Sequence, residues 1–179
     1  MTPPKILNQC RVCKSKNFQT ILKLKDTPFE DQFLKQKKIQ NTFPLEVAMC
    51  QSCSYVFLVH VVSPDISYES YIYESAITIG LTKHFHEYAK EIIDIYNIQK
   101  DSLIIDLGSN DGSMLQAFKE KKMRILGVEP AKEISKTANS KGLTTINSFF
   151  SSKIADKIIL NYGHANVITA NYMFANIDN

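Results

Sequence analysis

The sequence predicts an α/β protein: a small β domain that holds every cysteine, followed by part of a parallel α/β core. Three observations lead to this fold class. The cysteines form two C-x-x-C pairs, an apolar β-branched run ends in a glycine turn at Gly108, and the residues beyond alternate between helix and strand patterns. The predicted division is 1–75 for the cysteine domain, 76–100 for a connecting amphipathic helix and 101–179 for the partial core.

Composition fits one ordinary domain or two small ones. The chain has 179 residues, 44% of them hydrophobic, a mean hydropathy of -0.15 and a net charge of +3. Lysines are scattered apart from short clusters, so charge does not support nucleic-acid binding. The longest apolar stretch, residues 55–62, falls far short of the roughly 20 residues of a membrane span. Because the N-terminus lacks the apolar core of a signal peptide, we expect a cytoplasmic protein with reduced thiols.

The four cysteines pair as Cys10 with Cys13 and Cys50 with Cys53. Two residues between thiolates let one tight turn present both sulfurs to one ion, and two such turns complete a tetrahedral zinc site. Two disulfides, or a redox dithiol on a thioredoxin-like fold, are the alternatives. Reduced thiols in two pairs favour zinc. Since four thiolates leave no position for water, we expect the zinc to be structural.

The first 75 residues otherwise predict β structure. Residues 18–24 and 43–50 have strand patterns, and residues 54–62 predict a third strand after the second cysteine pair. Alone, such a module would indicate a zinc ribbon that binds nucleic acid or protein, which is the alternative function.

An amphipathic helix of about five turns is predicted from Ile79 onward, because apolar residues recur at spacings of three and four as far as Tyr96. His84 and His86 lie two residues apart on this helix. They therefore do not share a face, and we expect surface histidines and no metal pair.

Residues 101–150 predict a βαβαβ unit with a parallel sheet. "SLIID" has the pattern of a strand, residues 108–112 form its glycine turn, and residues 112–121 predict a helix. "RILGVEP" predicts the next strand, which ends at Glu129. A helix over 151–163 with a serine N-cap and a fourth strand within 165–174 continue the alternation.

Charge predicts the ligand of the glycine turn. A dinucleotide needs G-x-G-x-x-G, whereas this turn is G-x-x-x-G and has Asp111 where phosphates would lie. S-adenosylmethionine carries a sulfonium and an ammonium group, which Asp106 and Asp111 would attract. Glu129 lies 21 residues beyond Gly108, the usual place for a carboxylate that accepts both ribose hydroxyls. We therefore predict an S-adenosylmethionine site; a nicotinamide or flavin site and a ligand-free α/β domain are the alternatives.

Together these motifs resemble the bacterial sugar C-methyltransferases that act on nucleotide-linked deoxysugars. The similarity covers essentially the whole chain, through "CRVC", "DTPFEDQFL", "CQSC", "YESYIYESAIT", "IIDLGSNDGSML", "GVEPA" and "ANYMFANID". It implies a zinc domain followed by a partial Rossmann-like methyltransferase core, with four of the seven strands that such a core has. It also implies methylation, with S-adenosylmethionine as donor, of a carbon next to the ketone of a nucleotide-linked keto-sugar.

The resemblance assigns roles to individual residues. Zinc would be held by Cys10, Cys13, Cys50 and Cys53. The methyl donor would contact Asp106, Gly108, Ser109, Asn110, Asp111, Gly112, Glu129 and Asn171. Tyr71 and Tyr73 would lie over the sugar, where a hydroxyl can donate to the enolate oxygen that forms when the α-proton leaves. Tyrosines that only pack the domain seam are the alternative.

Two departures from the family concern catalysis. Where the family commonly has Ala-His-Ile after the fourth strand, this chain has Ala175, Asn176 and Ile177, and an amide cannot accept a proton as imidazole does. The histidine and glutamate used in proton abstraction lie farther along, in a segment that this sequence does not contain. We therefore expect a C-terminally truncated form that binds the donor and lacks self-sufficient catalysis. A partner chain, or self-association through the exposed fourth strand, would complete it; a methyltransferase for a non-sugar acceptor is another alternative.

Overall fold

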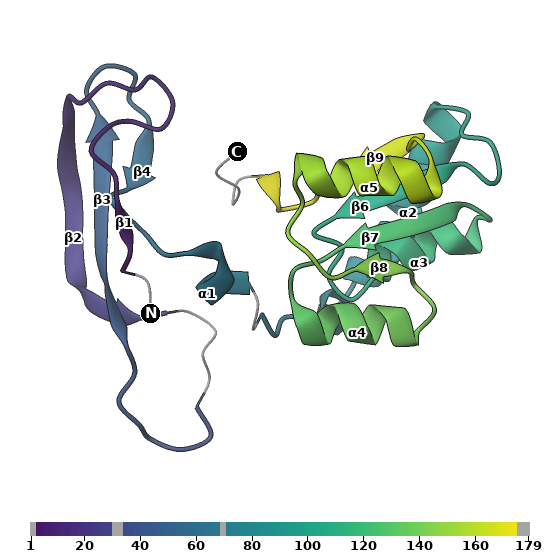
Figure 1. Ribbon diagram of the computed structural model, residues 1–179, viewed down its shortest axis with the longest axis horizontal. Coiled ribbons are helices and arrows are strands. Elements are labelled where there is room, and N and C mark those ends of the chain that lie inside the picture. Colours follow the sequence, from purple (N-terminus) through teal and green to yellow (C-terminus); the bar gives the residue numbers. More distant parts are fainter. Residues whose placement is uncertain (1–2, 30–33, 69–70, 175–179) are drawn as a thin grey trace. The chain divides into compact units, whose positions relative to one another are not determined.

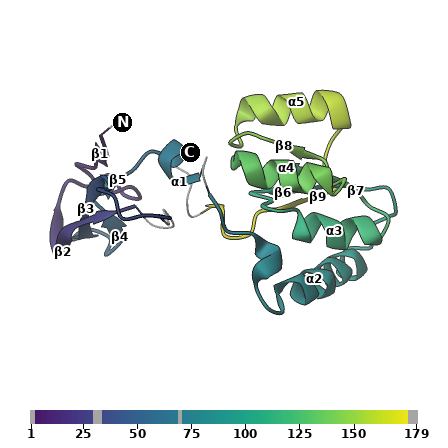
Figure 2. The same cartoon turned by 90° about the horizontal axis from the view of Figure 1, so that it is seen from below.

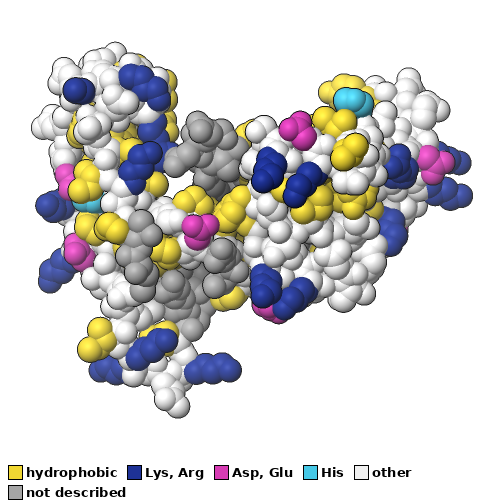
Figure 3. Space-filling view, in the orientation of Figure 1, with side chains coloured by type: hydrophobic (Ala, Val, Ile, Leu, Met, Phe, Trp, Pro, Cys, Tyr) yellow, Lys and Arg dark blue, Asp and Glu magenta, His cyan; other side chains and the backbone are white. Residues whose placement is uncertain are grey.

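The computed structural model describes residues 3–29, 34–68 and 71–174, and the chain divides into two compact units, Met1–Tyr68 and Glu69–Asn179 (Figure 1). Ala175 to Ile177, where the family's Ala-His-Ile would fall, lie outside the described residues. No helix in the described part of the chain combines the length and apolarity that crossing a membrane requires. On the face shown in Figure 3, lysine and arginine side chains are dispersed over each unit, as the scattered sequence positions predict.

The first unit is built from antiparallel strands, and the strands predicted at 18–24 and 43–50 are present and longer. One sheet has the order β2-β3-β4, from β2 (Phe18–Pro28), β3 (Thr42–Cys50) and β4 (Val56–Leu58). The second sheet pairs β1 (Lys5–Ile6) with β5 (His60–Val61). A short helix, α1 (Pro64–Tyr68), ends the unit.

The prediction of a single third strand over residues 54–62 is wrong, because the chain changes sheets at Val59. The amide of Val59 donates to the carbonyl of Glu46 on β3, whereas its carbonyl accepts from the amide of Leu7, just after β1. One residue therefore serves both sheets. Its side chain is buried in the small core of this unit.

The two faces of the β2-β3-β4 sheet differ in burial. Along β3, Ala48 and Cys50 point into the core, where Phe57 of β4 also lies. The other face carries Val47 between its cross-strand partners Leu22 and Leu58, each of which is nearly half exposed. Alternation along a strand produces this division, so most of the unit's apolar burial comes from one face only.

The second unit contains the predicted parallel sheet, in the order β8-β7-β6-β9. Counted within this unit, that order is 3-2-1-4. Its strands are β6 (Leu103–Leu107), β7 (Arg124–Val128), β8 (Thr145–Ile146) and β9 (Val167–Thr169). The connecting helices are α3 (Ser113–Glu120), α4 (Lys132–Ser140) and α5 (Ser152–Tyr162). The fold class predicted from the sequence is confirmed, including four parallel strands in the described residues.

Helices cover both faces of this sheet (Figure 2). On one face, Ile104 of β6 packs with Phe118 of α3. On the other, Leu103, Ile105 and Leu107 pack with Ile158 of α5. Successive residues of β6 thus serve opposite cores, as expected for a strand that is buried on both sides.

The predicted amphipathic helix is α2 (Leu81–Ile95), which has 15 residues and is shorter than the five turns expected. A short 3₁₀ turn, η1 (Ser75–Ile77), precedes it. The apolar stripe of α2, centred on Ala89, packs on the core that contains Phe118 of α3. This helix therefore belongs to the packed core of the second unit.

Candidate functional site

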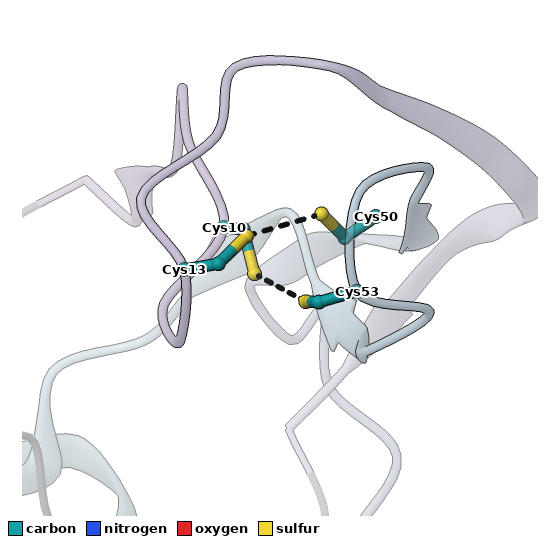
Figure 4. Close-up of side chains that lie close together, drawn as sticks. All are labelled: Cys10, Cys13, Cys50 and Cys53. Atoms are coloured by element: carbon teal, nitrogen blue, oxygen red, sulfur yellow. Dashed lines mark hydrogen bonds between the residues drawn. The ribbon is translucent and has the colours of Figure 1, made fainter.

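The four cysteine sulfurs of the first unit converge, with all of them within 4.8 Å of one another (Figure 4). The distance from Cys10 Sγ to Cys53 Sγ is 3.7 Å, and from Cys13 Sγ to Cys50 Sγ it is 3.5 Å. A zinc tetrahedron with Zn–S bonds of about 2.3 Å has sulfur–sulfur edges of about 3.8 Å, whereas a disulfide bond is about 2.05 Å long. All four thiols are free, so the arrangement fits a metal and not the disulfide alternative.

The two C-x-x-C turns are built alike. The amide of Lys14 donates to the carbonyl of Cys10, the amide of Ser54 donates to the carbonyl of Cys50, and both donor residues have a φ of 61°. Cys10 and Cys50, the first cysteine of each turn, are fully buried, and the second cysteines are exposed. Each turn thus presents one sulfur from the core and one from the surface.

Backbone amides inside these turns favour thiolates. Burial raises the pKa of Cys50, but the amides of Ser52 and Cys53, together with the side chains of Cys13 and Cys53, outweigh it and lower this pKa to about 6. The pKa of Cys10 is also lowered, because the amides of Cys13 and Val12 and the side chains of Cys13 and Cys53 together outweigh burial. The amide of Tyr55 lowers the pKa of Cys53, but the neighbouring sulfurs and burial raise it to about 12. Sulfurs this close repel one another as anions, and a divalent cation among them would remove that repulsion.

The glycine turn of the second unit leaves β6 at the carboxyl end of the sheet and starts α3. Gly108, Asn110 and Gly112 all have positive φ, of 71°, 50° and 80°. A Cβ on Gly112 would lie 2.6 Å from Leu143 Cδ1, so no larger side chain fits there without movement. The turn is compact because its backbone follows the left-handed region, which glycine and asparagine adopt most readily.

Two buried carboxyl groups lie at the carboxyl ends of the neighbouring strands β6 and β7: Asp106 is the second-last residue of β6, and Glu129 directly follows β7. Asp106 Oδ1 accepts a bond of 2.7 Å from the Thr169 hydroxyl of β9. Glu129 Oε2 accepts from the amide of Asn110 at 2.9 Å and its Oε1 from the amide of Ala131 at 2.8 Å. Burial and, to a smaller extent, the charge of Glu129 raise the pKa of Asp106 to about 7, although the Thr169 bond lowers it. Burial also raises the pKa of Glu129.

Asn110 and Asp111 are occupied within the protein. Asn110 Oδ1 accepts from the amides of Ser75 and Asp111, and Asn110 Nδ2 donates to the carbonyl of Tyr73. Asp111 is buried, and its carboxylate accepts from Ser113 and from the amide of Ala76. The Asp111 charge that was predicted to attract a ligand is therefore already balanced by hydrogen-bond donors of the protein. Contact of the Asn110 and Asp111 side chains with a ligand stays a prediction.

The remaining predicted site residues lie around the same turn. Ser109 is buried, and its Oγ has no hydrogen-bond partner among the described residues. Asn171 is exposed, in the loop after β9. A Cβ on Gly108 would lie 3.1 Å from Met173 Cγ, so this loop passes over the glycine turn. Tyr71 and Tyr73 are half-buried, with ring centroids 6.3 Å apart, and the Tyr73 hydroxyl lies 2.6 Å from the Thr78 hydroxyl.

Sequence reasoning missed two polar residues that support this site. Thr169 bonds to Asp106, and the Asn147 side-chain amide donates to the carbonyls of Glu129 and Pro130. Thr169 could have been suspected, because it is the hydroxyl residue that ends an apolar strand. Asn147 carries no comparable signal, since its partners depend on how the chain folds back after β8.

Comparison with known proteins gives a zinc-binding family and a methyltransferase relative. Residues 10–68 match a family model described as "Putative zinc binding domain". The C-methyltransferase NovU of Streptomyces niveus is 26% identical over 174 residues, which cover 96% of this chain and 41% of that protein. The two proteins are homologous. The predicted resemblance to a C-methyltransferase is confirmed, whereas the sugar acceptor and the truncation stay predictions. The chain spans about two fifths of the relative's length.

Solved structures of methyltransferases are more distant. The plantazolicin methyltransferase BpumL in complex with SAH is 18% identical, with a TM-score of 0.41 over 53% of this chain and 36% of that one. The magnesium protoporphyrin IX methyltransferase ChlM from Synechocystis PCC 6803 with bound SAM is 14% identical, with a TM-score of 0.36 over 40% of this chain and 38% of that one.

Proposed function

We propose that this chain forms the donor-binding part of an S-adenosylmethionine-dependent C-methyltransferase. The observation that carries the proposal is the similarity to NovU along 96% of the chain. It is supported by two carboxyl groups of raised pKa at the carboxyl end of a parallel sheet, beside a compact glycine turn. In open α/β sheets this is where ligands bind.

The donor suits these residues chemically. S-adenosylmethionine supplies an electrophilic methyl group on a sulfonium, and it also carries an ammonium group and a ribose diol. Asp106 and Glu129 are buried acids, and an approaching cation lowers the pKa of such groups. A cationic ligand would therefore offset the free-energy cost of burying their ionised forms. Glu129 accepts hydrogen bonds from two amides and has further lone pairs, which can accept hydrogen bonds from the ribose hydroxyls. Gly108, Ser109, Gly112 and Asn171 would line the same site.

The zinc role is a second part of the proposal. Cys10, Cys13, Cys50 and Cys53 would hold one structural zinc, because four thiolates fill a tetrahedral site. Metal analysis of protein purified without added metal should give about one zinc per chain. Metal-free protein with the same fold of the first unit would contradict this role.

The acceptor is proposed to be a nucleotide-linked keto-deoxysugar, on the strength of the motif resemblance. A C–H next to a ketone must lose its proton before it attacks the methyl group, and the enolate oxygen then needs a hydrogen-bond donor. Tyr71 or Tyr73 would donate to that oxygen. Methyl incorporation into a panel of nucleotide keto-sugars and non-sugar ketones separates a sugar acceptor from any other.

The donor site is tested by isothermal titration with S-adenosylmethionine. The variant Glu129→Gln should weaken binding by about tenfold or more, because the amide loses one acceptor and the charge. The control Glu133→Gln alters an exposed glutamate of α4 that pairs with Lys136, and it should leave the affinity unchanged. No heat with the wild-type chain, or equal affinities for the three proteins, would contradict the proposal.

A further inference from the structure

We infer that Asn110 and Asp111 are positioning residues that clamp the segment Tyr73–Ala76 to the glycine turn. Their side chains then serve the acceptor side of the site, whereas the methyl donor is bound by the backbone of the turn and by the other residues of the proposed site, Glu129 among them. The meaning of this clamp for catalysis rests on the proposed function. The clamp itself is a feature of hydrogen bonding that can be measured without any ligand.

The clamp consists of side-chain bonds to three successive points on the segment. Asn110 Nδ2 donates to the Tyr73 carbonyl at 2.8 Å. Asn110 Oδ1 accepts from the Ser75 amide at 2.8 Å, and Asp111 Oδ2 accepts from the Ala76 amide at 3.0 Å. These partners are 35 to 37 residues apart in sequence, so the contacts are tertiary and fix one segment against another.

On the other side, the same two residues are anchored in the turn. The amide of Asn110 donates to Glu129 Oε2 at 2.9 Å, and Asp111 Oδ1 accepts from the amide and hydroxyl of Ser113 at the start of α3. Lys141 Nζ, 4.0 Å from Asp111 Oδ2, further offsets the buried charge. Glu129 and the Tyr73 carbonyl are thus connected through one asparagine.

The left-handed backbone at Asn110 makes this connection possible. With φ at 50°, its amide points to Glu129 while its side chain reaches the segment. Asparagine tolerates this conformation better than most residues and brings both a donor and an acceptor. Glycine would tolerate it equally well but would carry neither group, which provides a clean substitution.

Fixing this backbone also orients a tyrosine. Tyr73 lies at the first clamped position, and its hydroxyl pairs with Thr78 just beyond η1 at 2.6 Å. The ring is therefore held at its backbone and at its tip. A ligand that binds Glu129 can therefore affect the Tyr73 ring through Asn110. This connection links binding of the methyl donor to the arrangement of the acceptor side.

The test is amide hydrogen exchange, resolved by NMR, in wild type, Asn110→Gly and the control Asn97→Gly. Asn97 also has positive φ, at 49°, and its side chain is exposed, so the control repeats the backbone change without the clamp. Asn110→Gly should speed exchange of the Ser75 amide by about tenfold, the value of one lost hydrogen bond. Asn97→Gly should leave it unchanged. Equal Ser75 exchange in all three proteins would overturn the inference.

A second variant guards against misfolding. Asn110→Asp retains the acceptor for the Ser75 amide and loses the donor to the Tyr73 carbonyl. The Ser75 amide should therefore stay protected, whereas the carbonyl ¹³C chemical shift of Tyr73, which reports the lost hydrogen bond, should change. An unchanged Tyr73 carbonyl shift in Asn110→Asp would also overturn the inference. The helical signal of each variant in circular dichroism shows whether the second unit is folded.

S-adenosylmethionine separates this inference from the proposed function. Asn110→Gly keeps the amide that donates to Glu129, so its affinity for the donor should stay within about threefold of wild type, less than the loss of one full hydrogen bond. Donor binding should slow Ser75 exchange in wild type and not in Asn110→Gly. Absence of donor binding in wild type contradicts the proposed function alone, since the exchange measured without ligand still decides the clamp. Tenfold weaker donor binding in Asn110→Gly would contradict the positioning role.

Discussion

The two units of this chain are stabilised in different ways. The first has a small core around Cys10, Ala48, Cys50, Phe57 and Val59, and one face of its main sheet is half exposed. The second has apolar clusters on both faces of its sheet, with helices over each. A small β unit with so little buried surface needs a cross-link, whereas the second can fold by apolar burial. The comparison predicts that each unit fails for a different reason.

Removing the metal site should have the largest effect and should be confined to the first unit. In Cys50→Ser, a neutral hydroxyl replaces a thiolate ligand, and the binding free energy of a structural zinc, about 10–16 kcal/mol in small zinc domains, is largely lost. We expect loss of amide protection throughout β2 and β3, measured by hydrogen exchange, with β6 and β7 still protected.

The matched control for this variant lies in the same turn. Ser52→Ala removes only the bond of 2.9 Å from the Ser52 hydroxyl to Ser15 Oγ, so β2 and β3 should stay protected. A chelator added to wild type should reproduce the effect of Cys50→Ser. If the strands keep their protection in Cys50→Ser, the first unit does not depend on a metal, and the comparison between the units fails.

Truncation of a core side chain should destabilise the second unit and leave the first unit unchanged. Phe118 is fully buried among Ile104, Met114 and Met123, so Phe118→Ala should lower the free energy of unfolding by about 3–5 kcal/mol. Urea unfolding followed by the helical signal of circular dichroism reports this unit, because α2 to α5 all belong to it. Phe150→Ala, at a side chain that is 41% exposed, is the control and should change little. A matching loss of zinc from Phe118→Ala would show that the units are not independent.

Much of this architecture could be predicted because it depends on local patterns. The C-x-x-C spacing determines which sulfurs can meet, and the alternation of apolar strands with amphipathic helices predicts a parallel sheet. Gly108 and Glu129 mark where its strands end. In each case a few neighbouring residues carry the signal, so no knowledge of tertiary contacts is needed.

Tertiary contacts explain what the sequence could not show. Val59 moves the chain between sheets because its two backbone groups bond to Glu46 and Leu7, which no pattern in residues 54–62 indicates. Asp111 seemed available to a cationic ligand, but its carboxylate accepts from Ala76, 35 residues away. Charge can be read from a sequence, whereas the partner that satisfies it depends on the fold.

The smallest expected effect concerns Asp106, whose burial lowers the stability of the second unit. Burial raises the pKa of Asp106 from 3.8 to about 7, so between these values the folded state keeps a proton that the unfolded state has lost. The ligand-free protein should therefore lose stability as the pH rises through this window and remain at the lower level above it.

Asp106→Asn keeps an acceptor for Thr169 and cannot ionise. It should gain on the order of 1–3 kcal/mol over wild type at pH 8 and little at pH 4, since one pKa unit is worth about 1.4 kcal/mol and relaxation reduces the total. Urea unfolding at both pH values measures this difference, with Asp94→Asn, at an exposed position of α2, as the control. If Asp106→Asn gains the same stability at both pH values, ionisation of the buried Asp106 carboxyl is not what lowers the stability of the second unit.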